Sequence, residues 1–576
     1  MPLRRPGMLV PVVFVLAAVL PLAASPAGAA MFDRPARTLR PGTPQQADLL
    51  PQYADKISDD AAAGLAPGTG VDGHPLYPGE VVLAARHGVI AAESAGGYNL
   101  RYADQAGTEL PRDQWIPTRT DTIYDLASLS KLFTSIVAMQ QVQAGRLDLD
   151  RTVASYLPAF AEGGKGDITV RQLMTHTSGL PPDPSPALWT YPTYDERIAA
   201  IYASKPTAAP GTTYIYSDLN MLTLQLLVEH LTGKPLDVAV RDGITAPLGM
   251  HDTMYDPPAS LKPRIAAEEY ELTPDRGLVW GQVHDENAWA LNGVAGHAGV
   301  FSTAHDLAIL CQTILNGGAY GHTRILSAQS VTAMMTNLNQ AFPGDDHGLG
   351  FELYQHWYMG ALATPYTAGH TGFTGTSLVI DPTTDSFVIL LTNHVHPNRN
   401  WGSTNGPRRA VADDVARAIA VHPARGRDAW YAGMADDSTA TLTAPVTLPA
   451  GRPATVNFDL WYDTEPASDF LHLEGSADGG ATWSPVPFAL HGRGLDTTTD
   501  GSVSGYDGHQ WLRASADLAD WSGPVQLRWR YTTDPLYHGR GVYVDDVRVA
   551  ADGRTVFDGE KDTAAFQAVG WTPSAN

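Results

Sequence analysis

The sequence predicts a two-part α+β protein: a mixed helix-and-strand region up to about residue 420 and an all-β sandwich from residue 444 onward. In the first region helical and strand patterns alternate irregularly, and Glu80–Ala85 with Gly88–Glu93 read as a hairpin. In the second region strand-like runs rich in β-branched and aromatic residues replace the helices. The 576 residues also exceed the usual size of one compact domain.

Shifts in composition predict the domain boundaries. Residues 1–29 have the pattern of a secretory signal peptide, with Arg4 and Arg5 before an apolar run and a small-residue cleavage site at Ala27-Gly28-Ala29. No later segment is apolar and long enough to span a bilayer, so we expect a secreted, extracellular bacterial protein without an integral membrane segment. The remaining boundaries are a flexible segment at 30–44, the mixed region at 45–421, a linker at 422–443 and the sandwich at 444–576.

The charge balance narrows the classes of partner. With 38 basic and 61 acidic residues the net charge is −23, which repels nucleic-acid backbones and anionic lipid. We therefore expect no nucleic-acid partner. The single cysteine, Cys311, excludes an intrachain disulfide.

Ser128 and Lys131 are the first candidates for catalytic chemistry. They lie three residues apart at the start of a predicted helix that runs to about Ala144, so both side chains project from one face. A serine hydroxyl needs a base to act as a nucleophile, and a lysine whose pKa falls on desolvation can supply one. Alternatively, Ser128 is only a helix N-cap. The chain has 7 lysines, and Lys131 is the one with a serine three residues before it.

Two later segments carry polar side chains that could reach the same cleft. Tyr216, Asp218 and Asn220 follow a Pro-Gly turn and precede an apolar helical segment. Gly369–Gly375 precedes a predicted strand, and its small residues would let a substrate backbone lie close to the strand edge. In contrast, His176 is interpreted as part of a structural turn at the end of a helix.

These segments, in this order, resemble the motifs of the penicillin-recognising serine hydrolases, which include class C β-lactamases, D-Ala-D-Ala carboxypeptidases and related esterases. The resemblance covers about residues 45–420. It implies a mainly antiparallel sheet flanked by helices, a helical subdomain and a cleft between them. The matching residues are Ser128 and Lys131, Tyr216-Ser217-Asp218 and His370-Thr371-Gly372.

The resemblance also implies roles for these residues. Ser128 would be acylated by the substrate, while Lys131 and Tyr216 share the proton transfers in an order that stays open. Backbone N–H groups of Ser128 and Phe373 would form the oxyanion hole. No metal ligand is expected in this site, and no cofactor.

Two departures from the family pattern bear on the substrate. Asp218 stands where the family often has Asn, and a carboxylate cannot donate to a substrate carbonyl as an amide does. Asn220 could substitute for that donor, or either residue could cap the following helix. His370 stands where most β-lactamases carry Lys, so anchoring of an anionic substrate should be weaker and should depend on pH.

The C-terminal region resembles the all-β module that follows the catalytic domain of secreted peptidases such as immune inhibitor A, which implies a jelly-roll-like sandwich. Exposed aromatic residues there could bind cell-wall glycan, although most are expected in the core. Asp545 and Asp546 could take part in a structural Ca²⁺ site.

Together these features predict a secreted serine hydrolase that cleaves a small peptide, amide or ester through an acyl-enzyme on Ser128. The first expectation for its substrate is a D-alanyl peptide of the cell wall. Alternatives are a carboxylesterase on small acyl esters, a weak β-lactamase, or a glycan-binding surface protein whose hydrolase domain is inactive.

Overall fold

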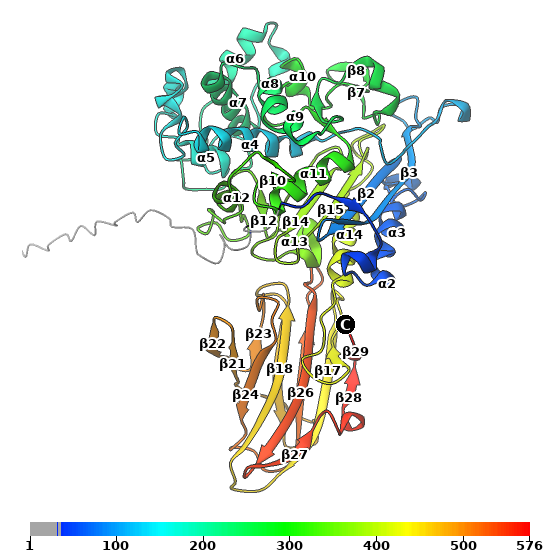
Figure 1. Ribbon diagram of the computed structural model, residues 1–576, viewed down its shortest axis with the longest axis vertical. Helices are drawn as coiled ribbons and strands as arrows, with labels where there is room; N and C mark the ends of the chain where they lie inside the picture. The colour runs from blue at the N-terminus through cyan, green and yellow to red at the C-terminus, as the bar shows by residue number, and fades with distance from the viewer. Residues whose placement is uncertain (1–31, 33–35) are drawn as a thin grey trace, which may run out of the picture.

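The structure of the protein is a computed structural model that describes residue 32 and residues 36–576. The predicted signal peptide therefore lies outside the described residues. Figure 1 shows two bodies along the long axis, a mixed body of helices and sheet above and a β-sandwich below. In the described part of the chain no helix is both long and apolar enough to cross a bilayer.

The upper body is built on an eight-stranded sheet with the order β1-β3-β2-β15-β14-β13-β12, in which β4 also pairs with β3. All neighbours are antiparallel except β1 and β3, and β2–β3 is the predicted hairpin. Its strands are β1 (Arg40–Pro41), β2 (Gly79–Arg86), β3 (Val89–Leu100), β4 (Ile116–Pro117), β12 (Glu352–Leu353), β13 (Ala368–Thr371), β14 (Ser377–Asp381) and β15 (Ser386–Thr392).

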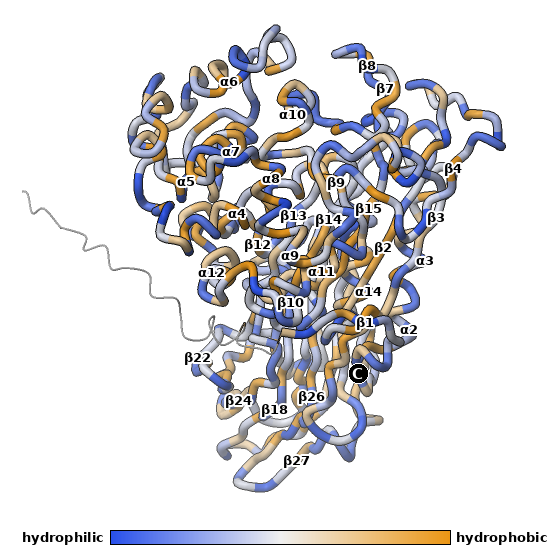
Figure 2. Tube along the Cα trace, turned by 45° about the horizontal axis from the view of Figure 1, so that its top comes forward, coloured by the Kyte–Doolittle hydropathy of each residue, from blue (hydrophilic) through white to orange (hydrophobic). Residues whose placement is uncertain are grey.

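Helices cover both faces of this sheet because its strands alternate their apolar side chains between two cores. On one face Val82 and Leu390 pack with helices α2 (Pro51–Ala54), α3 (Lys56–Ala63) and α14 (Asn405–Ala418). On the other face Leu83 and Leu391 join the larger core, which includes α11 (Ala304–Leu315). Figure 2 shows these hydrophobic segments gathered around β2, β14 and β15.

A helical subdomain lies beside the sheet and shares its larger core. Its central contact is between α4 and α7. Its helices are α4 (Ser130–Gln143), α5 (Val170–Met174), α6 (Tyr194–Ala203), α7 (Asp218–Thr232), α8 (Leu236–Val240) and α9 (Ala246–Leu248). The predicted α+β architecture of sheet, flanking helices and helical subdomain is confirmed.

The lower body consists of two antiparallel sheets around one apolar core. One sheet contains β16 (Ala429–Tyr431), β18 (Ala454–Asp463), β21 (Ala489–Gly492), β22 (Leu495–Thr498), β24 (Leu512–Asp517), β26 (Gly541–Ala551), β27 (Arg554–Asp558) and β29 (Thr572–Ser574). The other contains β17 (Thr439–Leu448), β19 (Phe470–Ser476), β20 (Ser484–Pro485), β23 (Ser502–Val503), β25 (Gly523–Thr532) and β28 (Gln567–Val569). Strand β16 and the start of β17 lie inside the segment expected to be a linker.

The two bodies contact each other through α14 and the loops at the near end of the sandwich. Arg409 Nη1 donates to Leu536 O at 2.8 Å, and Arg540 Nη2 donates to Ile419 O. His538 Nε2 lies 3.7 Å from Asp413 Oδ2. Helix α14 therefore belongs to the upper body and also forms the surface on which the sandwich rests.

Candidate active site

Ser128 lies on a short 3₁₀ turn, Ala127–Leu129, that leads directly into α4. The turn is held by Asp125, whose carboxylate accepts the N–H groups of Ala127 at 2.9 Å and of His284 at 2.6 Å. Ala127 has a φ of 47°, a backbone conformation that is costly for a residue with a Cβ. The chain thus holds a strained turn in place immediately before Ser128 and presents its hydroxyl at the helix N-terminus.

Lys131 is fully enclosed and contacts the serine hydroxyl. Its Nζ donates to Ser128 Oγ at 2.8 Å and to His297 O at 3.3 Å, and it lies 2.7 Å from Asp218 Oδ1. Burial by itself would lower the pKa of Lys131, but the negative charge of Asp218 and the neighbouring Tyr216 outweigh burial and raise it. The expected net lowering of this pKa is therefore wrong, because Asp218 and Tyr216 outweigh desolvation, and Lys131 is a cation in this arrangement.

Tyr216 lies against Lys131 on the loop that precedes α7. The ammonium is 4.8 Å from the centre of the Tyr216 ring, and burial raises the pKa of Tyr216 to about 12 although Lys131 opposes the shift. His176 supports this loop from behind: its ring lies 4.7 Å from that of Tyr216, and its Nδ1 accepts the Ser217 N–H at 3.0 Å. His176 is structural, as the sequence indicated, but it supports the site directly.

Asn220 does not reach the cleft. Its side chain is buried, accepts a hydrogen bond from Ser178 Oγ and lies 3.1 Å from His176 Nδ1. The suggestion that Asn220 replaces an amide donor at position 218 is therefore wrong. Asp218 itself is absent from the cleft lining and pairs with Lys131 instead of facing a substrate.

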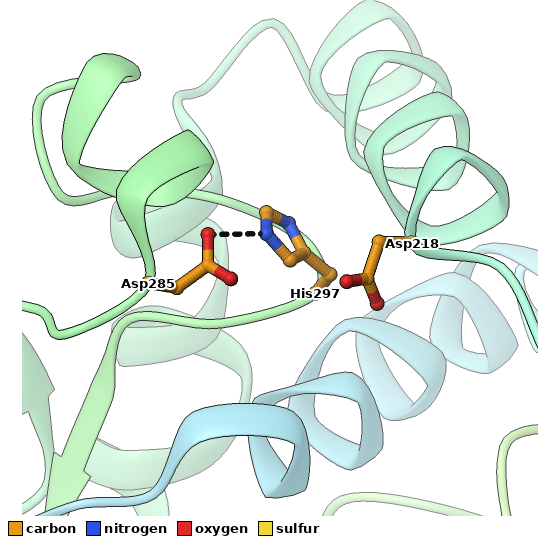
Figure 3. Close-up of side chains that lie close together, drawn as sticks. All are labelled: Asp218, Asp285 and His297. Carbon is orange, nitrogen blue, oxygen red and sulfur yellow. Dashed lines mark hydrogen bonds and ion pairs between the residues drawn. The ribbon is translucent and has the colours of Figure 1, made fainter. Parts of the chain in front are cut away.

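Asp218 lies next to a second ion pair. His297 Nε2 is 2.8 Å from Asp285 Oδ1, and Figure 3 shows the His297 ring between the carboxylates of Asp285 and Asp218. Burial opposes both charged forms, yet the attraction within the pair lowers the pKa of Asp285 and raises that of His297. The negative charges of Asp218 and Asp285 are thus balanced by the positive charges of Lys131 and His297 next to Ser128.

The His370–Gly372 segment ends β13 and is tied to the serine turn. Thr374 Oγ1 donates to Asp125 O at 2.8 Å, and Thr376 Oγ1 donates to Leu126 O at 3.0 Å. A Cβ on Gly372 would lie 2.1 Å from Thr376 Oγ1 and 2.4 Å from Leu126 O, so only glycine permits this approach. Phe373 follows, with 57% of its surface exposed at the mouth of the cleft.

His370 is buried within the strand and is neutral. Its Nδ1–H donates to Thr371 O at 2.8 Å, and burial together with the charge of Lys131 lowers its pKa to about 3. An imidazolium at this position is thus absent near neutral pH. The expectation that His370 anchors an anionic substrate in a pH-dependent way is therefore wrong.

A cleft of ≈ 430 Å³ opens in front of Ser128. It brings together Ser128, Tyr216 and the β13 turn, as the motifs predicted. The side chains and backbone that line it come from five stretches of the chain: Ser128, Tyr216, Glu352, Trp357, Thr371, Gly372, Phe373, His394, Val395, Arg399, Gly402, Ser403, Thr404, Asn405 and Arg408.

Comparison with known proteins identifies the family. The family model described as beta-lactamase matches residues 71–413. The chain belongs to the beta-lactamase family. Its C-terminal part, residues 403–576, matches the model described as immune inhibitor A-like, MAM domain.

Relatives of this beta-lactamase-family chain match somewhat more than half of its length. A protein of Escherichia coli (strain K12) named "Putative D-alanyl-D-alanine carboxypeptidase" is 34% identical over 351 residues, which are 56% of this chain and 79% of that protein. A protein of the same name from Salmonella typhimurium (strain LT2) is 33% identical over 356 residues, with the same coverage of 56% and 79%. Among solved structures, EstCE1, a hydrolase with promiscuous acyltransferase activity, has 23% identity and a TM-score of 0.49, covering 65% of this chain and 99% of its own.

The sequence motifs miss two side chains of this beta-lactamase-family site. Arg408, at the start of α14, is buried, and its Nη2 donates to Gly372 O at 2.7 Å and to Thr376 O at 3.0 Å. Glu352 lines the cleft, and burial raises its pKa to about 7. Both lie far in sequence from the motifs, and no local pattern marks them.

Proposed function

We propose that the protein is a secreted serine hydrolase that forms an acyl-enzyme on Ser128 and acts on D-alanyl peptides of the cell-wall type. The observation that carries this proposal is the 2.8 Å hydrogen bond from Lys131 Nζ to Ser128 Oγ at the base of the cleft. The names of the relatives from Escherichia coli and Salmonella support the substrate class.

In the proposed reaction Ser128 Oγ attacks the substrate carbonyl carbon, and the serine proton passes to whichever of Lys131 and Tyr216 has first lost its own proton. The N–H groups of Ser128 and Phe373 stabilise the oxyanion. The leaving amine takes a proton from the same pair as the carbon–nitrogen bond breaks. Water then attacks the acyl carbonyl, which frees Ser128 and the carboxylate product.

A carboxylesterase is the second candidate, and the neutral His370 favours it. A D-alanyl peptide ends in a carboxylate, and a buried neutral imidazole offers that group no charge. The Asp218 carboxylate, paired with Lys131, also offers no donor to an amide substrate. Small acyl esters need neither contact.

Labelling of Ser128 tests the proposal. Wild type, Ser128→Ala and Ser130→Ala are incubated with a fluorescent penicillin and a fluorophosphonate probe, then assayed on a D-Ala-D-Ala peptide and on short-chain nitrophenyl esters. Ser130→Ala is the matched control, because Ser130 Oγ accepts the Val300 N–H in the core.

We expect labelling and turnover in wild type and in the control, and neither in Ser128→Ala. Labelling without any dependence on Ser128 would refute the acyl-enzyme. Turnover of esters alone would replace the carboxypeptidase with the esterase. Secretion is tested separately, by recovering from the culture medium a mature chain that begins at Ala30.

A further inference from the structure

The loops at the end of the sandwich that faces α14 carry three acidic side chains. Glu465 and Asp469 lie between β18 and β19, and Asp534 follows β25. We propose that Glu465, Asp469 and Asp534 form a binding site for a divalent cation, and that the cation is Ca²⁺. This site lies apart from the cleft and does not depend on the activity proposed for Ser128.

The spacing of the three carboxylates fits one ion. One oxygen of each residue lies within 4.8 Å of the corresponding oxygens of the other two. Oxygen ligands bind Ca²⁺ at about 2.3–2.6 Å, so two of them on opposite sides of an ion are roughly 4.6–5.2 Å apart. All three pairs of oxygens are therefore close enough to share a single Ca²⁺.

Two carboxylate oxygens of this cluster, one on Asp469 and one on Glu465, are buried and accept no hydrogen bond from the described residues. Asp469 has 0% of its surface exposed; its Oδ1 accepts the Asp534 N–H at 3.1 Å, whereas its Oδ2 accepts no hydrogen bond. Glu465 Oε2 is also buried and accepts no hydrogen bond. Burying unpaired carboxylates is costly, and a bound cation removes that cost.

Two other buried or half-buried acids of the sandwich have arginine partners. Asp546 is within 2.7–3.1 Å of Arg425, Arg513 and Arg548, and Glu474 pairs with Arg528 and Arg530. Among the described residues no lysine, arginine or histidine nitrogen forms an ion pair with Glu465, Asp469 or Asp534. A bound cation would supply the positive charge that no ion-pair partner supplies to this cluster.

Arginines already neutralise Asp546, which counts against that residue as a Ca²⁺ ligand, whereas Asp545 has no arginine partner among the described ion pairs. Burial and mutual repulsion raise the pKa of Glu465 to about 7 and that of Asp469 to about 6. Ligands that are all carboxylate oxygens suit a hard cation, and Ca²⁺ tolerates irregular shells completed by water better than Mg²⁺ does.

Calorimetry and thermal unfolding of the full chain test the site after treatment with EDTA. We expect one Ca²⁺ per chain, with a Kd on the order of 10⁻⁴ M, and weaker binding of Mg²⁺. Saturating Ca²⁺ should raise the Tm of the chain's unfolding transition by about 2 °C. Asp469→Asn and Glu465→Gln should each weaken Ca²⁺ binding at least about tenfold, which corresponds to one lost charged ligand.

The control is Asp496→Asn, an exposed acid on β22 of the same sandwich, which should bind Ca²⁺ like wild type. Without Ca²⁺, Asp469→Asn should unfold at the same temperature as wild type or higher, because one repelling charge is gone. Absence of Ca²⁺ binding to wild type would overturn the proposal. An unchanged Kd in both Asp469→Asn and Glu465→Gln would overturn it as well, as would equal affinity for Mg²⁺.

Discussion

Asp218 controls the charge of the residues around Ser128. Its carboxylate raises the pKa of Lys131 and also that of Tyr216. Whichever of the two accepts the serine proton must first be deprotonated, so Asp218 moves the acidic limb of the activity profile to higher pH. An uncharged residue of the same shape at position 218 removes this effect from both candidates.

We therefore predict that Asp218→Asn shifts the acidic limb of kcat/KM to lower pH. A shift of one pH unit would correspond to about 1.4 kcal/mol of lost charge interaction. The measurement is the profile of kcat/KM from pH 5 to 10 on a nitrophenyl ester. Asp218 raises the pKa of both Lys131 and Tyr216. An acidic limb that does not move in Asp218→Asn would therefore show that neither residue is the base.

The buried histidines near the cleft predict a loss of stability in acid. Burial lowers the pKa of His347 to about 4 and that of His370 to about 3, whereas the unfolded chain titrates near 6.5. As the pH falls, the unfolded state therefore takes up protons before the folded state does. The contribution of these two histidines to the free energy of unfolding is complete above about pH 6.5 and is lost as the pH falls toward about 4. Each histidine can remove up to about 1.4 kcal/mol per pH unit.

His347→Gln tests this linkage, because glutamine cannot titrate but can still donate to Gly348 O as the His347 ring does. Urea unfolding of wild type and variant at pH 6.5, 5.5 and 4.5 measures the slopes. We expect the free energy of unfolding to fall less steeply with acid in the variant. Parallel slopes would show that His347 is protonated in the folded protein as readily as in the unfolded one.

At the residue scale, the motifs predicted which side chains meet but not their charges. Ser128 and Lys131 lie one helical turn apart, so their contact follows from local geometry. The pKa of Lys131 instead depends on Asp218, which only the packing of α7 against α4 brings within 2.7 Å. Likewise, the burial that makes His370 neutral comes from surrounding elements, which a local motif does not reveal.

At the scale of elements, α14 connects the cleft with the sandwich through two consecutive arginines. Arg408 donates to the carbonyls of Gly372 and Thr376, which flank the proposed oxyanion donor Phe373. Arg409 points the other way and donates to Leu536 O. Arg408 therefore supports the cleft, whereas its neighbour Arg409 supports the interface with the sandwich.

We predict that Arg408→Ala lowers kcat about 10–100-fold, because the turn that carries Phe373 loses its two buried donors. The same change should cost about 2–4 kcal/mol of stability. Arg409→Ala is the matched control, and its kcat should stay within about twofold of wild type. Steady-state kinetics of the two variants, each with its unfolding curve, provide the comparison. Equal values of kcat would refute the assignment of Arg408 to the turn.

Long or strongly periodic elements were predictable, and short ones were not. The β2–β3 hairpin follows from two short strand-like runs around His87-Gly88, and the long strands β18, β25 and β26 follow from their β-branched and aromatic residues. In contrast, β16 has three residues and exists because β26 and β29 pair with it. A strand fixed by distant partners has no signal of its own.

At the scale of the whole molecule, Arg540 joins the two bodies. Its side chain is buried, donates to Ile419 O at the end of α14 and lies 5.1 Å from the centre of the Trp461 ring. It also supplies positive charge near the buried carboxylate of Asp463, whose pKa burial raises. Removing Arg540 leaves Ile419 O without this hydrogen-bond donor and Asp463 without this nearby positive charge. These two groups lie on opposite sides of the interface.

We predict that Arg540→Ala uncouples the unfolding of the two bodies. Each body has its own apolar core, so each can remain folded when the other opens. Loss of a buried, hydrogen-bonded cation should cost the interface about 3 kcal/mol, and calorimetry should then resolve two transitions where wild type shows one. Ester turnover should persist, because Ser128 and Lys131 lie in the upper body. The control is Arg554→Ala, an exposed change on β27, which should unfold like wild type. A single unshifted transition in Arg540→Ala would mean that other contacts hold the bodies together.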